Sequence, residues 1–205
     1  RNFEIFLAEI QADGSPILTQ VTHTEDGVNI LPDISADGRF LTFVSDNDLL
    51  GDGQLMSNQL EIFRADVSDS QAITFTQITD GGGDTVFSDE PAISGDGSLI
   101  AFVSDQDLEG NGKNADGNRE IFLAQVAPDG AITCRQVTET TAGTNEQPDL
   151  TDDGARLIYL SNDNVPAGPR RIYQADIDVA TLDFVTAPQR LATAPSGDLD
   201  RPNLS

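Results

Sequence analysis

Two acidic loops carry the residues whose types and spacing suit metal chemistry. Both contain the pattern Asp-x-Asp-Leu-x-Gly-[Asp/Asn]-Gly, at residues 46–53 and 105–112. A hard cation such as Ca²⁺ takes several oxygen ligands, and alternating Asp and Asn with glycines offers those oxygens on a tight loop. The candidate calcium ligands are Asp46, Asp48, Asp52, Asp105, Asp107, Asn111 and Asp116.

These loops resemble the Asp-x-Asp-x-Asp-Gly calcium loops of EF-hands and of integrin-type propeller repeats. The spacing departs from both, because a leucine and one further residue separate the acidic pair from the first glycine. Glu61 and Glu120 offer further carboxylates downstream of the two loops. The alternative is a solvated turn in which Asp and Asn side chains cap their own backbone. The third loop, residues 161–168, is shorter and less acidic, and we assign it no metal.

No catalytic constellation accompanies the acidic loops. His23 is the only histidine, in a polar stretch typical of an exposed loop, and the Gly-x-Ser-x-Gly elbow of serine hydrolases is absent. The single cysteine, Cys134, lies in an expected strand at 131–135 and is interpreted as a small packing residue. With so few histidines and cysteines the sequence offers no zinc site. We therefore expect no catalysis by this chain itself.

The charge balance limits the partners. Eleven basic residues against 35 acidic ones give a formal net charge of −24. Such a surface repels nucleic acid phosphates and anionic lipids and attracts cations. No apolar run approaches the ~18 residues that a membrane-spanning helix needs. Nucleic acid binding and membrane insertion are both excluded on these grounds.

The elements that must position the acidic loops belong to an internal repeat. Glu-Ile-Phe occurs at 4–6, 61–63 and 120–122, with the variant Arg-Ile-Tyr at 171–173. A hairpin pattern recurs beside it at 32–46, 91–105 and 148–163, and residues 202–205 begin a fourth copy. Repeats of this length indicate one supersecondary unit per copy.

Each copy is predicted to hold four strands, which we call A to D. Strand A covers 31–35, 90–94 and 147–151, with a proline near its start, and an Asp-Gly turn links it to an apolar strand B. Strand C covers 60–67, 120–126 and 171–177, and strand D covers 73–79, 132–138 and 184–192. The chain opens with strands C and D of an earlier unit, around 3–10 and 17–22. No window shows a helical period.

Tandem four-stranded units predict an all-β fold, a β-propeller of antiparallel blades. We expect one propeller domain, or a fragment of one, over residues 1–205. The blades cover about 31–80, 90–138 and 147–192, and the partial blades cover 1–22 and 201–205. Three full blades with partial terminal blades indicate part of a longer propeller, or one that a second copy completes.

The motif Pro-x-Ile-Ser-x-Asp-Gly, followed by Phe-Leu-Thr-Phe-Val-Ser-Asp and Glu-Ile-Phe, resembles the WD40-like PD40 repeat. That repeat forms the propeller of TolB-type periplasmic proteins and of prolyl-oligopeptidase relatives. The family usually has proline at the second turn position, where Ala36, Gly95 and Asp152 stand here. The resemblance covers essentially the whole chain.

Two functions follow from this resemblance as expectations. The first is a non-catalytic, periplasmic or extracellular bacterial module that binds or scaffolds proteins, with Ca²⁺ pinning its long loops. Its partner would be another protein, or a second copy meeting the open blade faces. The alternative is the accessory propeller of a larger secreted or periplasmic hydrolase of the peptidase type.

Overall fold

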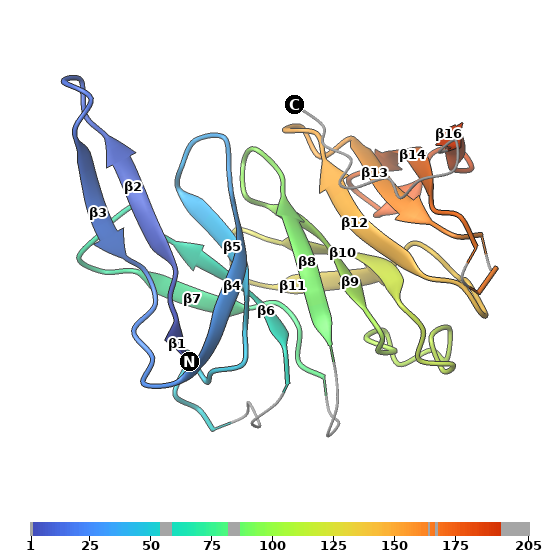
Figure 1. The fold of residues 1–205 in the computed structure, drawn as a ribbon, viewed down its shortest axis with the longest axis horizontal. Helices are drawn as coiled ribbons and strands as arrows, with labels where there is room; N and C mark the ends of the chain where they lie inside the picture. The colour runs from blue at the N-terminus through green and yellow to red at the C-terminus, as the bar shows by residue number, and fades with distance from the viewer. Residues whose placement is uncertain (1, 54–58, 82–86, 164, 167, 194–205) are drawn as a thin grey trace.

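The computed structural model describes residues 2–53, 59–81, 87–163, 165–166 and 168–193. These residues form strands, turns and loops, and none of them is helical. Figure 1 shows the strands gathered into sheets that stand side by side in chain order. The predicted all-β class and the blade architecture are confirmed. The expected fourth hairpin copy, residues 202–205, lies outside the described residues.

No helix long and apolar enough to span a membrane occurs in the described part of the chain.

Three blades follow a short N-terminal part. That part holds β1 (Asn2–Phe3) and the hairpin of β2 (Phe6–Ile10) and β3 (Pro16–Gln20). Blade 1 contains β4 (Gly27–Ile34), β5 (Phe40–Ser45), β6 (Glu61–Asp66) and β7 (Thr74–Gln77). Blade 2 contains β8 (Ser88–Ile93), β9 (Leu99–Ser104), β10 (Glu120–Val126) and β11 (Ile132–Gln136). Blade 3 contains β12 (Asn145–Leu150), β13 (Arg156–Ser161), β14 (Arg171–Asp178), β15 (Asp183–Phe184) and β16 (Gln189–Thr193).

The predicted A–B turn forms in every blade. In blade 1 the N–H of Gly38 donates to the carbonyl of Ser35 over 2.9 Å, and the Ser35 hydroxyl accepts from the N–H of Phe40 over 2.9 Å. Gly38 has a φ of 71°, which an L side chain rarely adopts. The Asp-Gly pair therefore fixes the register of the hairpin.

Strand A is longer than predicted, and its proline has another role. Strand A starts five residues before its proline in blade 1 and three residues before it in blades 2 and 3, so the proline lies inside the strand rather than at its entry. The register slips by one residue there, for example between Ile30 and Asp33, and the residue before each proline has positive φ. Because a bulge leaves one residue unpaired, it accommodates the N–H that proline lacks.

Two other strand predictions were wrong in detail. The first strand, expected near 3–10, is divided into β1 and β2, and β1 pairs in parallel with β4 of blade 1. The last strand, expected at 184–192, is divided into β15 and β16, which both pair with β14. Pro188 precedes β16 and has no N–H to continue a ladder.

The core lies between the sheets. One apolar cluster joins the β2–β3 hairpin to blade 1, a second joins blade 1 to blade 2, and a third joins blade 2 to blade 3. Every residue of β5 and β9 is buried, as expected for strands that are apolar on both faces. Blades 1 and 2 thus bury both faces against their neighbours in the row, and blade 3 buries one face against blade 2.

Candidate functional site

The B–C loops and the starts of the A strands meet at one end of the row of blades, which we call the loop end. In Figure 1 the first two of these loops lie at the lower edge, opposite the A–B turns. All seven predicted metal ligands lie there, because each follows strand B of blade 1 or blade 2. The loop end is therefore the surface on which a site has to be sought.

The loop of blade 1 folds around the carboxylate of Asp48. That carboxylate accepts the N–H groups of Gly51 at 2.7 Å, Asp52 at 3.3 Å and Gly53 at 2.7 Å. Gly51 and Gly53 both have positive φ, which turns their N–H groups inward. Backbone hydrogen bonds, that from Gly53 foremost, lower the pKa of Asp48. The aspartate therefore holds its own loop in shape.

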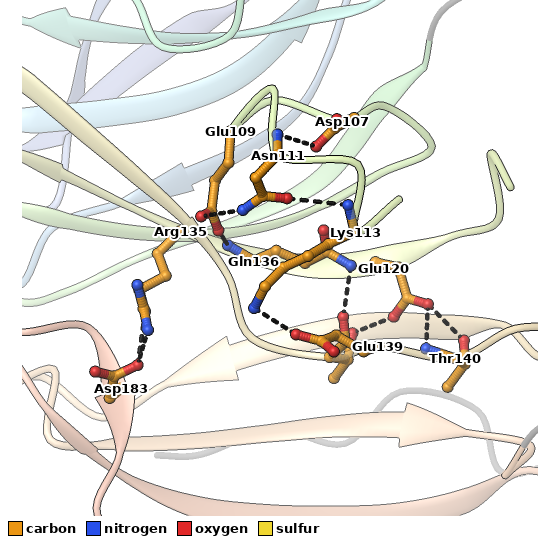
Figure 2. A network of polar contacts seen from close by, with 11 residues as sticks. Asp107, Glu109, Asn111, Lys113, Glu120, Arg135, Gln136, Glu139, Thr140 and Asp183 are labelled. Carbon is orange, nitrogen blue, oxygen red and sulfur yellow. Dashed lines mark hydrogen bonds and ion pairs between the residues drawn. The ribbon is translucent and has the colours of Figure 1, made fainter. Parts of the chain in front are cut away.

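The loop of blade 2 repeats this arrangement and adds ties to its blade (Figure 2). The Asp107 carboxylate accepts from the N–H of Asn111 at 3.3 Å and of Gly112 at 2.7 Å. Glu109 accepts from the N–H of Gln136 at the end of β11, and Lys113 forms an ion pair with Glu139. This loop is fixed at both ends and along its length.

The leucine of each loop motif points into the core. Leu49 packs on the cluster between the β2–β3 hairpin and blade 1. Leu108 packs on the cluster between blades 1 and 2. The spacing that the two loops share is thus explained by a leucine that anchors the loop in the core and an aspartate that caps the backbone of its own loop.

Asp46 and Asp105 cap the entry of a neighbouring strand instead of pointing into their loops. The Asp46 carboxylate accepts from the N–H of Val28 at 2.7 Å, and that of Asp105 accepts from the N–H of Phe87 at 3.1 Å. Asn162 occupies the same place in blade 3, where its side-chain oxygen accepts from the N–H of Thr144 at 2.9 Å. Asp52, Asn111 and Asp116 are exposed.

The described residues contain no group of three or more His, Cys, Asp or Glu side chains that could hold a metal ion. A calcium site on these loops would need backbone carbonyls and amide oxygens to complete it. Calcium binding by the seven residues stays a prediction.

The two downstream glutamates join strands rather than face the loops. Glu120 is fully buried and accepts four hydrogen bonds: from the Thr138 hydroxyl at 2.5 Å, from the N–H and hydroxyl of Thr140 at 2.5 and 2.6 Å, and from the Asn145 amide at 2.8 Å. One carboxylate thereby ties strand C, the end of strand D and the next blade. Burial raises the pKa of Glu120, against the lowering effect of these hydrogen bonds.

Glu61 and Glu4 make the corresponding junctions in blade 1 and in the N-terminal part. Glu61 is fully buried and accepts from the Thr79 hydroxyl and from the N–H of Gly81. Glu4 accepts from the Thr22 hydroxyl and from the N–H of Thr24 at 2.7 Å. The glutamate of the Glu-Ile-Phe motif, which the sequence showed only as a marker, therefore ties strand C to the end of strand D, and Glu4 and Glu120 also accept from an asparagine of the next blade.

Blade 3 has no glutamate at this position, and a pocket lies on its side that faces blade 2, beside the Glu120 joint. Arg171 stands where the other copies have glutamate, and its guanidinium pairs with Asp163. The stacked pair Phe102–Phe122 of blade 2 becomes Tyr159–Tyr173, with ring centroids 5.6 Å apart. The pocket opens between blades 2 and 3 and is lined by these tyrosines, Asp163, residues 137–140, Asn145, Ser161, Phe184 and Pro188.

Sequence reasoning missed this pocket. The signal was present in the variant triplet at 171–173, in the exchange of phenylalanine for tyrosine and in the shorter third loop. What it did not show was that the three changes meet at one point between two blades.

The sequence matches no family model and no curated protein. Solved structures do resemble it. TolB from Acinetobacter baumannii aligns with a TM-score of 0.61 and 20% identity over 98% of this chain. A TolB-type structure from Agrobacterium tumefaciens aligns with a TM-score of 0.56 and 18% identity over 92% of it. A puromycin-hydrolyzing peptidase from Mycobacterium tuberculosis aligns with a TM-score of 0.54 and 20% identity over 89% of it.

The chain is shorter than all three of these proteins. It spans 40% and 60% of the two TolB chains and 26% of the peptidase chain. Its sheets, their order and this likeness together show that the chain has a TolB-like β-propeller fold.

Proposed function

We propose that the chain is a non-catalytic propeller module that binds or scaffolds other proteins through an open blade face. The observation that carries this proposal is the outer face of the β2–β3 hairpin. Phe6, Ile10 and Leu18 are 58%, 67% and 67% exposed. The register pairs Ala8 with Leu18 and Ile10 with Pro16, so these side chains share one face.

The equivalent face is covered in the other blades. Phe63 and Phe122 stand at the position of Phe6 in the repeat, and both are fully buried against the preceding sheet. An apolar sheet face of this kind is a typical protein interaction surface. Its natural occupant is the apolar face of another blade, supplied by a second copy of this chain or by a propeller-containing partner.

Sedimentation velocity over a concentration series tests this assignment. We expect self-association that a Leu18→Glu substitution abolishes, because the charge would be buried at the contact. Ala12→Glu, in the exposed turn of the same hairpin, is the control for added charge. A wild-type chain that stays monomeric throughout would remove the second copy as the occupant.

Calcium stabilisation of the long loops is a finer part of the same proposal. A bound ion would raise the melting temperature, since a ligand that binds only the folded state stabilises it. The test is thermal melting with calcium and with a chelator at equal ionic strength, followed by Asp48→Ala and Asp107→Ala. An unchanged melting temperature would reject the ion, and unchanged affinity in both variants would reject the ligands.

An accessory propeller of a larger hydrolase is the second candidate. The likeness to the puromycin-hydrolyzing peptidase favours it, because this chain spans only 26% of that protein. The sequence of the complete gene decides between the two candidates: an adjoining α/β-hydrolase domain would replace the scaffold proposal with the accessory one. Both candidates place the protein in the periplasm or outside the cell, which fractionation of the producing bacterium would test.

A further inference from the structure

A pocket lies between blades 2 and 3 at the loop end. It encloses about 380 Å³. In blade 2 the corresponding space is closed, because Leu108 packs on the cluster that contains Phe102 and Phe122. In blade 3 the loop is shorter, and Val165, at the position of Leu108, is 49% exposed.

Most hydrogen-bond donors around the pocket are already used. The hydroxyls of Thr138 and Thr140 and the amide of Asn145 all donate to Glu120. The Tyr173 hydroxyl donates to Asp163. The lining therefore presents mainly oxygen lone pairs and carboxylates, which suits a ligand group that only donates.

The Tyr159 hydroxyl is the exception, because no described residue hydrogen-bonds to it. The residue is only 4% exposed, and it lines the pocket. Burial raises the pKa of this phenol, which keeps it neutral. A hydroxyl in the pocket lining that no described residue engages is available to a ligand there.

Two carboxylates reach the pocket, and each of them also has a cationic partner in the chain. Glu139 and Asp163 reach the pocket with side chains that are 58% and 31% exposed, and Glu120 lies behind Thr138 and Thr140. Lys113 and Arg171 each pair with one of these two carboxylates from outside the lining. The rest of the chain adds a strong negative field, since its net charge is −24.

We propose that this pocket binds an alkylammonium group, with its alkyl chain against Tyr159, Tyr173 and Phe184 and its ammonium at Glu139 and the Tyr159 hydroxyl. An ammonium has three donors and no acceptor, which matches the acceptor-rich lining. Aromatic rings attract cations and pack on methylene groups. The group can come from the lysine side chain of a protein or from a free amine, so this proposal does not depend on the open-face module proposed above.

The chain supplies its own reporter for this binding. It has two tyrosines and no tryptophan, and both tyrosines line the pocket. Tyrosine fluorescence therefore reads the site directly. We expect a saturable change on titration with n-butylammonium chloride that weakens with added salt, and no comparable change with butyrate or 1-butanol.

Two variants test the contacts, and one serves as a control. Glu139→Gln should weaken butylammonium binding roughly tenfold, as expected for loss of one charge-assisted hydrogen bond. Tyr159→Phe should weaken it by a few-fold while Tyr173 still reports. Glu9→Gln, on the distant hairpin, removes the same charge and should leave the affinity unchanged.

Equal affinity in the Glu139→Gln variant and the wild type, equal binding of butanol, or no saturation below about 100 mM butylammonium would overturn the proposal. A peptide acetyl-Gly-Lys-Gly-amide that binds more tightly than butylammonium, and loses binding on acetylation of its side chain, would identify a protein lysine as the source. Equal or weaker binding of the peptide would identify a free amine.

Discussion

Blades 2 and 3 share one strand pattern and differ at the loop end. In blade 2, Glu120 joins three strands through four hydrogen bonds, and Leu108 seals the blade contact below the loop. In blade 3, Arg171 pairs with Asp163, and Val165 stays half exposed. The A–B turn hairpin is alike in both, with Gly97 and Gly154 at φ values of 72° and 67°.

The copies of the repeat share their backbone features and differ in the side chains that lie between blades. The turn, the bulge and the strand register are backbone features, so every copy must retain them to stack. The contacts between blades are made by side chains. One copy can carry different side chains there, provided that the neighbouring blades still pack together. Function is therefore to be sought where a copy departs from the pattern, as blade 3 does.

The largest effect is expected when the closed joint is broken. Glu120→Ala leaves buried donors of Thr138, Thr140 and Asn145 without their acceptor and should lower the free energy of unfolding by about 3 kcal/mol. Arg171→Ala, at the same repeat position, removes a half-buried ion pair and should cost less than about 1 kcal/mol. Urea denaturation measures both, and similar losses would show that the two blades are joined alike.

A smaller effect is expected at Leu108, the apolar side chain that fills the contact between blades 1 and 2. Leu108→Ala opens a cavity between blades 1 and 2 and should cost about 2 kcal/mol, because the side chain is partly buried. Val165→Ala should cost less than about 0.5 kcal/mol, since that residue is half exposed. If the valine substitution matched the leucine one in urea denaturation, the pocket would not be open in solution.

The pH dependence of stability should differ between substitutions in blade 2 and substitutions in blade 3. Burial raises the pKa of Glu120 above its usual value of 4.5, so the protonated form is favoured in the folded state. The stability contributed by this shift is fully present below pH 4.5 and is lost as the pH rises through the raised folded-state pKa.

The Glu120→Gln substitution tests the direction of this pH dependence. The stability of the wild type minus that of the variant should fall between about pH 4 and pH 8, while Glu61 behaves alike in both proteins and cancels. Arg171→Gln should show no such trend, because arginine stays charged over this range. A flat difference for Glu120→Gln would mean that its hydrogen bonds outweigh burial.

The smallest effect is expected from converting one aromatic ring of blade 3 to the type found in blade 2. Tyr159→Phe should change the free energy of unfolding by less than about 0.5 kcal/mol, because the Tyr159 hydroxyl has no described hydrogen-bond partner and Phe102 packs in the equivalent place. A loss above about 1 kcal/mol would show that the hydroxyl makes a structural contact. Calorimetry beside the fluorescence titration measures this change.

The sequence by itself determined the repeat, the strand order and the hairpin turns, because these depend on local spacing and on residues such as Gly38, whose positive φ few other residue types adopt. It also placed the acidic loops after strand B. Local patterns could predict these features, since each is decided within about ten residues of the chain.

Tertiary structure alone decided what the acidic and aromatic residues do. Glu120 and Asp107 look alike as acidic residues near a loop, yet one lies buried between blades and the other caps its own loop at the surface. The pocket at Tyr159 needs residues from two blades to meet. Burial and convergence are long-range properties, so the spacing of residues within one repeat does not contain them.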